Sequence, residues 1–134
     1  MKIVRHIPIF AFLLVFYNLL AFSAGDAASP LEKVWLTTDL VSGAVLRVTV
    51  SDLIIMLGIA SLYAEIFKAT RPTQLSILDH VLSMLVFVIY LVEFLVFYQV
   101  GQAAFLILTL MSFLDVIAGF TVTIVAARRD ITMN

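Results

Sequence analysis

Long apolar runs separated by short polar segments set the pattern of this 134-residue chain. A helix that crosses a bilayer needs about 20 consecutive apolar residues, and its backbone polar groups must find partners within the helix. Four runs approach or exceed this length, so we predict transmembrane helices over residues 7–23, 52–69, 76–98 and 103–127. The expected fold class is an all-α integral membrane protein, a four-transmembrane-helix bundle that forms one membrane domain over residues 1–134.

The segment between the first two helices has a different pattern. Over residues 33–50, valines and leucines are interspersed with threonine and arginine, and Ser42-Gly43 supplies a turn signal between two β-rich arms. We predict a short β-hairpin that lies on the outer membrane surface. Because an isolated hairpin is marginal in water, we expect it to pack on the helix ends or on a partner, with Trp35 at the bilayer interface.

Composition supports the membrane assignment and argues against several function classes. The chain is 63% hydrophobic and 13% charged, with a mean hydropathy of +1.16, whereas a soluble domain is nearer half apolar. A net charge of −1 argues against nucleic-acid binding. The lack of cysteine excludes disulfides and thiolate metal sites, and no motif of a hydrolase, zinc peptidase or phosphate-binding loop is present. We therefore expect no enzyme activity, no catalytic residues and no cofactor.

Basic residues near the helix ends predict the orientation in the membrane. One side would hold Lys33 and Arg47, and the other side would hold both chain termini. Six of the eight Lys and Arg residues fall on the side with the termini, namely Lys2, Arg5, Lys68, Arg71, Arg128 and Arg129. Both termini are therefore expected in the cytoplasm.

The first apolar run has a second interpretation. A basic start, an apolar stretch and then small residues also describe a secretory signal peptide that is cut after Gly25 or Ala27. Cleavage would leave three helices and an outer N-terminus, with the other helices in the same orientation. The run is longer than a usual signal core, which favours retention of residues 1–25.

Asp115 is the most unusual residue of the pattern, because it lies near the middle of the fourth apolar run. A central Asp costs about 2.5–3.5 kcal/mol on insertion scales, so such residues usually face a bundle interior and often mark function. Ser112 and Gly119 lie on the same helix face, where small residues let another helix approach. No Lys or Arg is expected at this depth, so we predict a neutral carboxyl or one hydrogen-bonded to Asn18 of the first helix. This favours a strut between helices; proton or cation handling and contact with another subunit are the alternatives.

A second polar stripe follows the third helix, where Asp79, Ser83, Tyr90 and Glu93 share one face. Asp79 would lie near the inner surface and Glu93 near the outer one, so the two could form a proton or cation ladder with Asp115. The simpler alternative takes Asp79 as a helix cap. Glu93 would then reach the interface or bond to Tyr90.

Glu65, Lys68 and His80 gather at the inner ends of the second and third helices. Glu65 and Lys68 have the spacing of a local ion pair, and a hydrogen bond from His80 to Glu65 would tie the two helices together. Glu65, Asp79 and His80 could in principle ligate a divalent metal. Their spacing matches no metal signature, so we predict no metal site.

Several segments resemble a group of small inner-membrane proteins of alphaproteobacteria whose function is unknown. The family patterns IDHxLSMLVF, EFL and DVxAGFTV are similar to residues 78–87, 93–95 and 115–122, although the chain has ILDH where the family has IIDH. The resemblance covers most of the chain. It implies a bacterial cytoplasmic membrane and no known activity.

Together these patterns predict a non-enzymatic inner-membrane protein that acts by helix–helix assembly with itself or with partner membrane proteins. The alternative is a small oligomeric channel or transporter that handles protons or cations through its intramembrane carboxylates. Its expected surroundings are the lipid bilayer, and no nucleic acid is expected among its partners.

Overall fold

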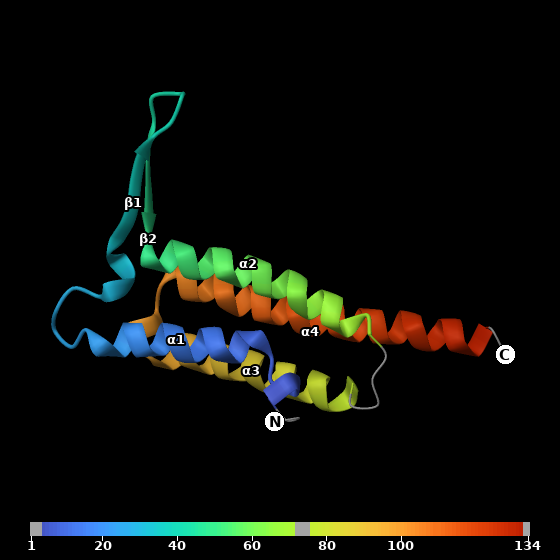
Figure 1. Ribbon diagram of the computed structural model, residues 1–134. Helices are drawn as coiled ribbons and strands as arrows, with labels where there is room; N and C mark the ends of the chain where they lie inside the picture. Colours follow the sequence, from blue (N-terminus) through green and yellow to red (C-terminus); the bar gives the residue numbers. More distant parts are fainter. Residues whose placement is uncertain (1–3, 72–75, 133–134) are drawn as a thin grey trace.

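The computed structural model describes residues 4–71 and 76–132. Four helices run side by side, and a two-stranded hairpin projects from one end of them (Figure 1). This order confirms the predicted helices and the hairpin between the first two. The bounds are α1 Ile9–Ser23, β1 Val34–Asp39, β2 Val45–Thr49, α2 Val50–Ala69, α3 Ser76–Val96 and α4 Ala103–Thr132, with 3-10 turns η1 Val4–His6, η2 Pro30–Glu32 and η3 Tyr98–Val100.

Three of the helices are long and apolar enough to cross a membrane. Their apolar spans are Val50–Ala69, Ile77–Val96 and Ala103–Arg129. Helix α1 has 15 residues, which is about 22 Å at 1.5 Å per residue and shorter than a hydrocarbon core of about 30 Å. It begins at Ile9, two residues after the predicted start at about residue 7, because Pro8 is the N-cap residue in an extended conformation, and Val4–His6 form η1 instead.

Two other boundaries differ from the prediction because apolar character does not decide where a helix ends. Helix α3 stops at Val96, and the next residue, Phe97, is extended and leads into η3. Helix α4 continues through Arg128 and Arg129 to Thr132. Neither arginine breaks a helix, and positive charges near a helix C-terminus interact favourably with its dipole.

Helix α4 is the centre of the packing, since it lies along both α2 and α3, while α1 packs against α2 and α3. Gly58 permits the close contact between α2 and α4. A Cβ added to Gly58 would lie 2.9 Å from Leu108 Cδ2 and 2.9 Å from Met111 Sδ. The absence of a side chain at this position therefore sets the distance between the two helices.

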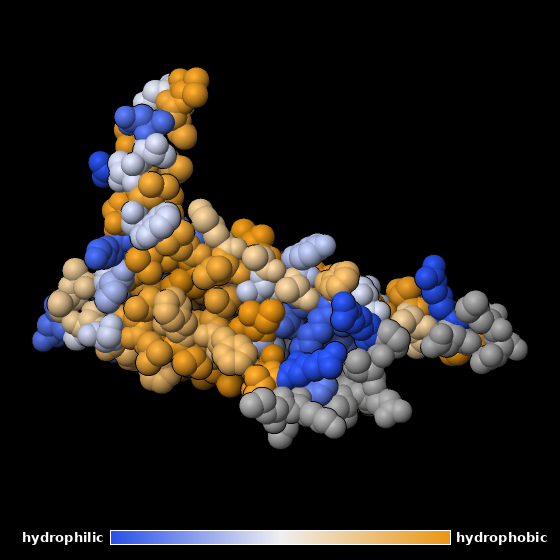
Figure 2. Space-filling model, viewed as in Figure 1, coloured by the Kyte–Doolittle hydropathy of each residue, from blue (hydrophilic) through white to orange (hydrophobic). Residues whose placement is uncertain are grey.

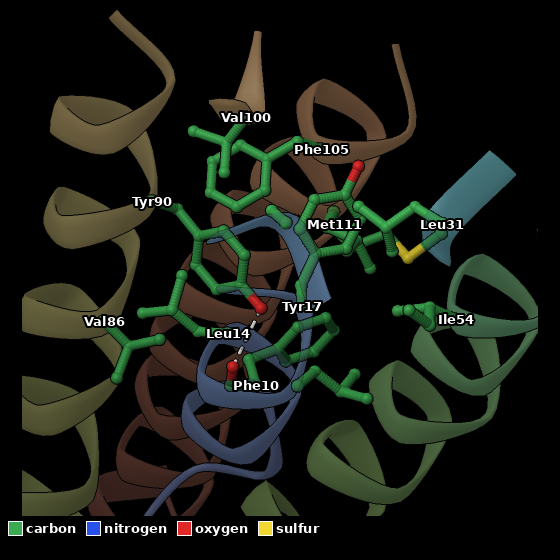
Figure 3. Packing of buried hydrophobic residues seen from close by; sticks show 13 residues of the cluster. Phe10, Leu14, Tyr17, Leu31, Ile54, Val86, Tyr90, Val100, Phe105 and Met111 are labelled. Atoms are coloured by element: carbon green, nitrogen blue, oxygen red, sulfur yellow. Dashed lines mark hydrogen bonds between the residues drawn. The ribbon is translucent and has the colours of Figure 1, made fainter. Parts of the chain in front are cut away.

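An aromatic cluster fills the bundle near the end that carries the hairpin, which we call the hairpin end. The ring of Phe105 lies 5.2 Å from that of Tyr17 and 5.3 Å from that of Tyr90, measured between centroids. Figure 3 shows Leu31 and Ile54, from other parts of the chain, on one side of these rings. The core thus joins all four helices and η2 at this end.

The hairpin is antiparallel, with Leu36 opposite Val48 and Thr37 opposite Arg47. An irregularity at Trp35 separates this register from the first pair of the ladder. Gly43 has φ +86° in the turn, a conformation that favours glycine. This agrees with the predicted turn signal at Ser42-Gly43.

Only the base of the hairpin packs on the helices. Val48 is buried, but every residue of β1 is exposed, and Trp35 is 65% exposed. The expected packing on the helix ends is therefore limited to the base. The hairpin extends at a large angle to the helix axes (Figure 1), and apolar residues follow one side of it (Figure 2).

Candidate functional site

A polar cavity lies between α2, α3 and α4 at the end where α2 stops and α3 begins, which we call the α2–α3 end. Its volume of about 40 Å³ is enough for about three water molecules. Titratable and hydroxyl side chains from three helices meet there, although they are far apart in the sequence. The lining residues are Glu65, Lys68, Ala69, Arg71, Asp79, His80, Ser83, Asp115, Gly119 and Thr123.

Asp115 and Glu65 are the buried carboxyl residues of this cavity, and within the described part of the chain Asp115 is the one without a partner. It is 6% exposed, and it takes part in none of the hydrogen bonds or ion pairs among residues 4–71 and 76–132. Ser112 is 1% exposed and Gly119 is buried on the same face of α4. The predicted inward face of α4 agrees with this burial.

Two expectations for Asp115 are wrong. Asn18 does not reach it, because Asn18 Nδ2 donates instead to Glu93 Oε2 at 2.8 Å. Basic residues do line the same cavity, namely Lys68 and Arg71. The predicted depths assumed that each helix is centred in the bilayer on its own. In the structure, α4 extends well past the end of α2, so the middle of α4 lies beside the last turn of α2 (Figure 1).

Glu65 binds the start of α1. Its Oε1 accepts a hydrogen bond from the backbone N–H of Ile9 at 2.9 Å, where Pro8 as N-cap offers no side-chain cap. A carboxylate at a helix N-terminus also interacts favourably with the helix dipole. The predicted partners are wrong: in the described part of the chain Glu65 forms neither an ion pair with Lys68 nor a hydrogen bond with His80.

His80 joins α3 to α4 through Thr123 rather than α3 to α2. The distance between His80 Nε2 and Thr123 Oγ1 is 2.7 Å, and Thr123 Oγ1 donates to the carbonyl of Gly119 at 2.9 Å. Since that hydroxyl proton is already used, His80 Nε2 is the donor and, in a neutral ring, Nδ1 is the acceptor. The ring stacks on Phe120 with 4.9 Å between centroids. It also fills the space beside Gly119, where a Cβ would lie 3.1 Å from Nδ1.

Asp79 pairs with a residue that the sequence analysis did not select. Asp79 Oδ1 lies 2.8 Å from His6 Nδ1, and the two residues join η1 to the first turn of α3. The position of Asp79 in that turn agrees with the expected favourable interaction with the helix dipole. The hydropathy pattern locates the apolar run of α1 but not the residues before it, so it did not indicate His6 as a partner.

Other polar residues tie both the start and the second half of α1 to its neighbours. Tyr90 Oη donates to the carbonyl of Phe10 at 2.8 Å (Figure 3), so the expected bond between Tyr90 and Glu93 is wrong. Tyr17 Oη donates to Gln102 Oε1, a pair that the sequence analysis missed. The only sequence signal for this pair is that both residues carry a polar side-chain group at a similar depth along the bundle.

The structure therefore divides the selected residues into two groups. Glu65, Asp79, His80 and Asp115 line one cavity, whereas Glu93 and Asn18 pair near the hairpin end. Apolar core residues lie between the groups along the helices, for example Val86 on α3 and Leu108 on α4. Of the three carboxyls in the hypothetical ladder, Asp79 and Asp115 share the cavity, but Glu93 is separated from them within one chain.

The cavity brings a carboxyl that has no hydrogen-bond partner among the described residues together with an imidazole, hydroxyls and an ammonium group. Such a carboxyl can exchange protons with water or hold a small polar species. Among the described residues, no three His, Cys, Asp or Glu side chains are arranged to hold a metal ion.

No family model matches the sequence, and no curated protein or solved structure is significantly similar to it.

Proposed function

We propose that the chain is a non-enzymatic, multi-pass protein of the bacterial cytoplasmic membrane that acts by helix–helix assembly with itself or with partner membrane proteins. Helices α2, α3 and α4 have the length and the apolar composition to cross a bilayer. Helix α1 would be the fourth crossing, with residues 4–8 and the chain after Ser23 in the headgroup regions. Side-chain and backbone hydrogen bonds tie α1 to α2, α3 and the start of α4.

The distribution of charge supports an orientation with both termini in the cytoplasm. Arg5, Lys68 and Arg71 lie at the α2–α3 end, whereas Lys33 and Arg47 lie in or next to the hairpin. Lys2, which was counted on the same side in the sequence, lies outside the described residues. The positive-inside rule then assigns the α2–α3 end to the cytoplasm and the hairpin to the outer surface.

The observation that carries assembly is the extension of α4. The helix continues past the ends of α2 and α3 (Figure 1), and Ile124 and Val125 are 53% and 52% exposed on it. If Lys68 and Arg71 mark the inner surface, α4 passes this surface near Ile124 and Val125, just after the contact of Thr123 with His80, and their apolar side chains are uncovered. Exposed apolar surface of this kind marks sites of protein contact.

Cross-linking in membranes tests assembly. The chain has no cysteine, so Ile124→Cys and Val125→Cys can be cross-linked without background, with Val92→Cys as the control because Val92 is equally exposed on α3. Assembly through α4 predicts cross-linked species at 124 and 125 and few at 92. Equal yields at all three positions, or none, would contradict it.

A second function, handling of protons or small cations, is favoured by Asp115 alone, because this carboxyl faces a polar cavity without a hydrogen-bonding partner in the described residues. Passage across the membrane would then require several copies, since the apolar core separates the cavity from Glu93.

Flux into liposomes tests this second function. Proton or potassium entry should be abolished by Asp115→Asn and retained by Glu93→Gln, which keeps a hydrogen-bond acceptor for Asn18. The second function would be contradicted if the wild-type protein showed no flux, or if the wild-type and Asp115→Asn proteins showed equal flux.

A further inference from the structure

A second hollow opens at the α2–α3 end, on the side of α1. It lies between η1, the end of α2 and the first turn of α3, and its volume is about 290 Å³. Its polar lining comes from Arg5, His6, Lys68, Arg71 and Asp79, and its apolar wall comes from Phe67 and Ala64. It is close to the size of the smaller ligand sites in proteins, about 300 Å³.

The charges of this hollow do not balance. Asp79, the one carboxylate of the lining, already faces His6 at 2.8 Å. Arg5, Lys68 and Arg71 make no ion pair with any residue that the structure describes, although the guanidinium of Arg71 lies 5.3 Å from the centroid of the Phe67 ring. Within the lining of this hollow, three cations thus face one carboxylate, while Lys68 and Arg71 also border the adjacent cavity that holds Glu65 and Asp115.

The hollow also borders the apolar surface of the bundle. Phe67 is 52% exposed, and Ala64 is exposed one turn earlier on α2. Figure 2 shows hydrophilic residues gathered at this end of the bundle, directly beside its apolar belt. A ligand with an anionic head and an apolar tail would match both surfaces at once.

We propose that this hollow binds the phosphate headgroup of an anionic phospholipid of the inner leaflet. Guanidinium and ammonium groups donate hydrogen bonds to phosphate oxygens, and basic pockets between helices on the cytoplasmic side are suited to lipid headgroups. The acyl chains would lie along Ala64 and Phe67. The inference rests on the proposed insertion and orientation.

Lipid retention by the purified full chain tests the site. Phosphatidylglycerol bound after exchange into detergent is counted by native mass spectrometry, with phosphatidylcholine as the neutral reference lipid. We expect Lys68→Gln with Arg71→Gln to lower phosphatidylglycerol retention about tenfold or more. The matched control, Lys33→Gln with Arg47→Gln, removes the same two charges at the hairpin end and should leave retention unchanged.

Each other outcome overturns the proposal in a distinct way. If both double variants lost the same amount of phosphatidylglycerol, the lipid would be attracted by the net charge of the protein and not by a specific site. Displacement of the lipid by millimolar inorganic phosphate, with no preference for the lipid, would mean a site for free phosphate. If cysteine labelling shows the proposed topology but the wild-type protein retains no anionic lipid, only this inference fails. If labelling shows a different topology, the proposed function fails first.

Discussion

At the scale of single residues, the buried and half-buried polar side chains have two different uses. Tyr90, Asn18, Glu65 and Asp79 each hold a specific atom of another segment through a hydrogen bond or ion pair. Asp115 faces a cavity instead. An unpaired polar group in an apolar bundle costs free energy, so the paired residues stabilise the fold, whereas Asp115 depends on whatever occupies the cavity.

Tyr90→Phe should show the stabilising use directly. The substitution keeps the ring between Val86 and Phe105 and removes only the bond to the Phe10 carbonyl. We expect a loss of about 1 kcal/mol in the free energy of unfolding, measured by denaturation in detergent. Tyr63→Phe is the matched control, because Tyr63 is 73% exposed and should change little. Equal effects of the two substitutions would contradict this role of Tyr90.

At the scale of elements, apolar run length and turn chemistry were enough to predict the four helices and the hairpin. They could not predict pairing, because a hydrogen bond between helices depends on their relative shift along the bundle. The offset of α4 against α2 is the clearest case, since it brings Lys68 to the cavity of Asp115. The start of α1 and the ends of α3 and α4 were also missed, because Pro8, the extended Phe97 and the arginines act through the backbone and the dipole rather than through hydropathy.

The contact between α2 and α4 gives a prediction at this scale. Gly58→Val should destabilise the bundle by about 1–3 kcal/mol, because the new side chain would meet Leu108 and Met111. Gly58→Ala should cost less, since the side-chain ends of both neighbours can shift. Gly101→Ala is the control, because its Cβ would meet only the Tyr98 carbonyl, at 3.4 Å. Thermal unfolding of the four proteins in one detergent would rank them, and a Gly58→Val protein as stable as the wild type would refute the close packing.

At the scale of the whole molecule, every proposal depends on one arrangement in the bilayer. The hairpin and the α2–α3 end must lie on opposite sides, with α1 as a crossing helix despite its 15 residues. The contacts of α1 at both of its ends support this, since Glu65 holds its first residue and Glu93 bonds to Asn18 in its second half. The cavity, the hollow and the end of α4 would then all face the cytoplasm.

Single-cysteine labelling of intact cells is the most direct test of this arrangement. Val4, Val41 and Ile131 are exposed at η1, the hairpin turn and the end of α4, and each can be replaced by Cys in a chain that has no other. A membrane-impermeant thiol reagent should label Val41→Cys in intact cells and label Val4→Cys and Ile131→Cys only after the inner membrane is permeabilised. Labelling of Val4→Cys from outside, or its loss from the mature chain, would show that α1 is not a retained crossing helix.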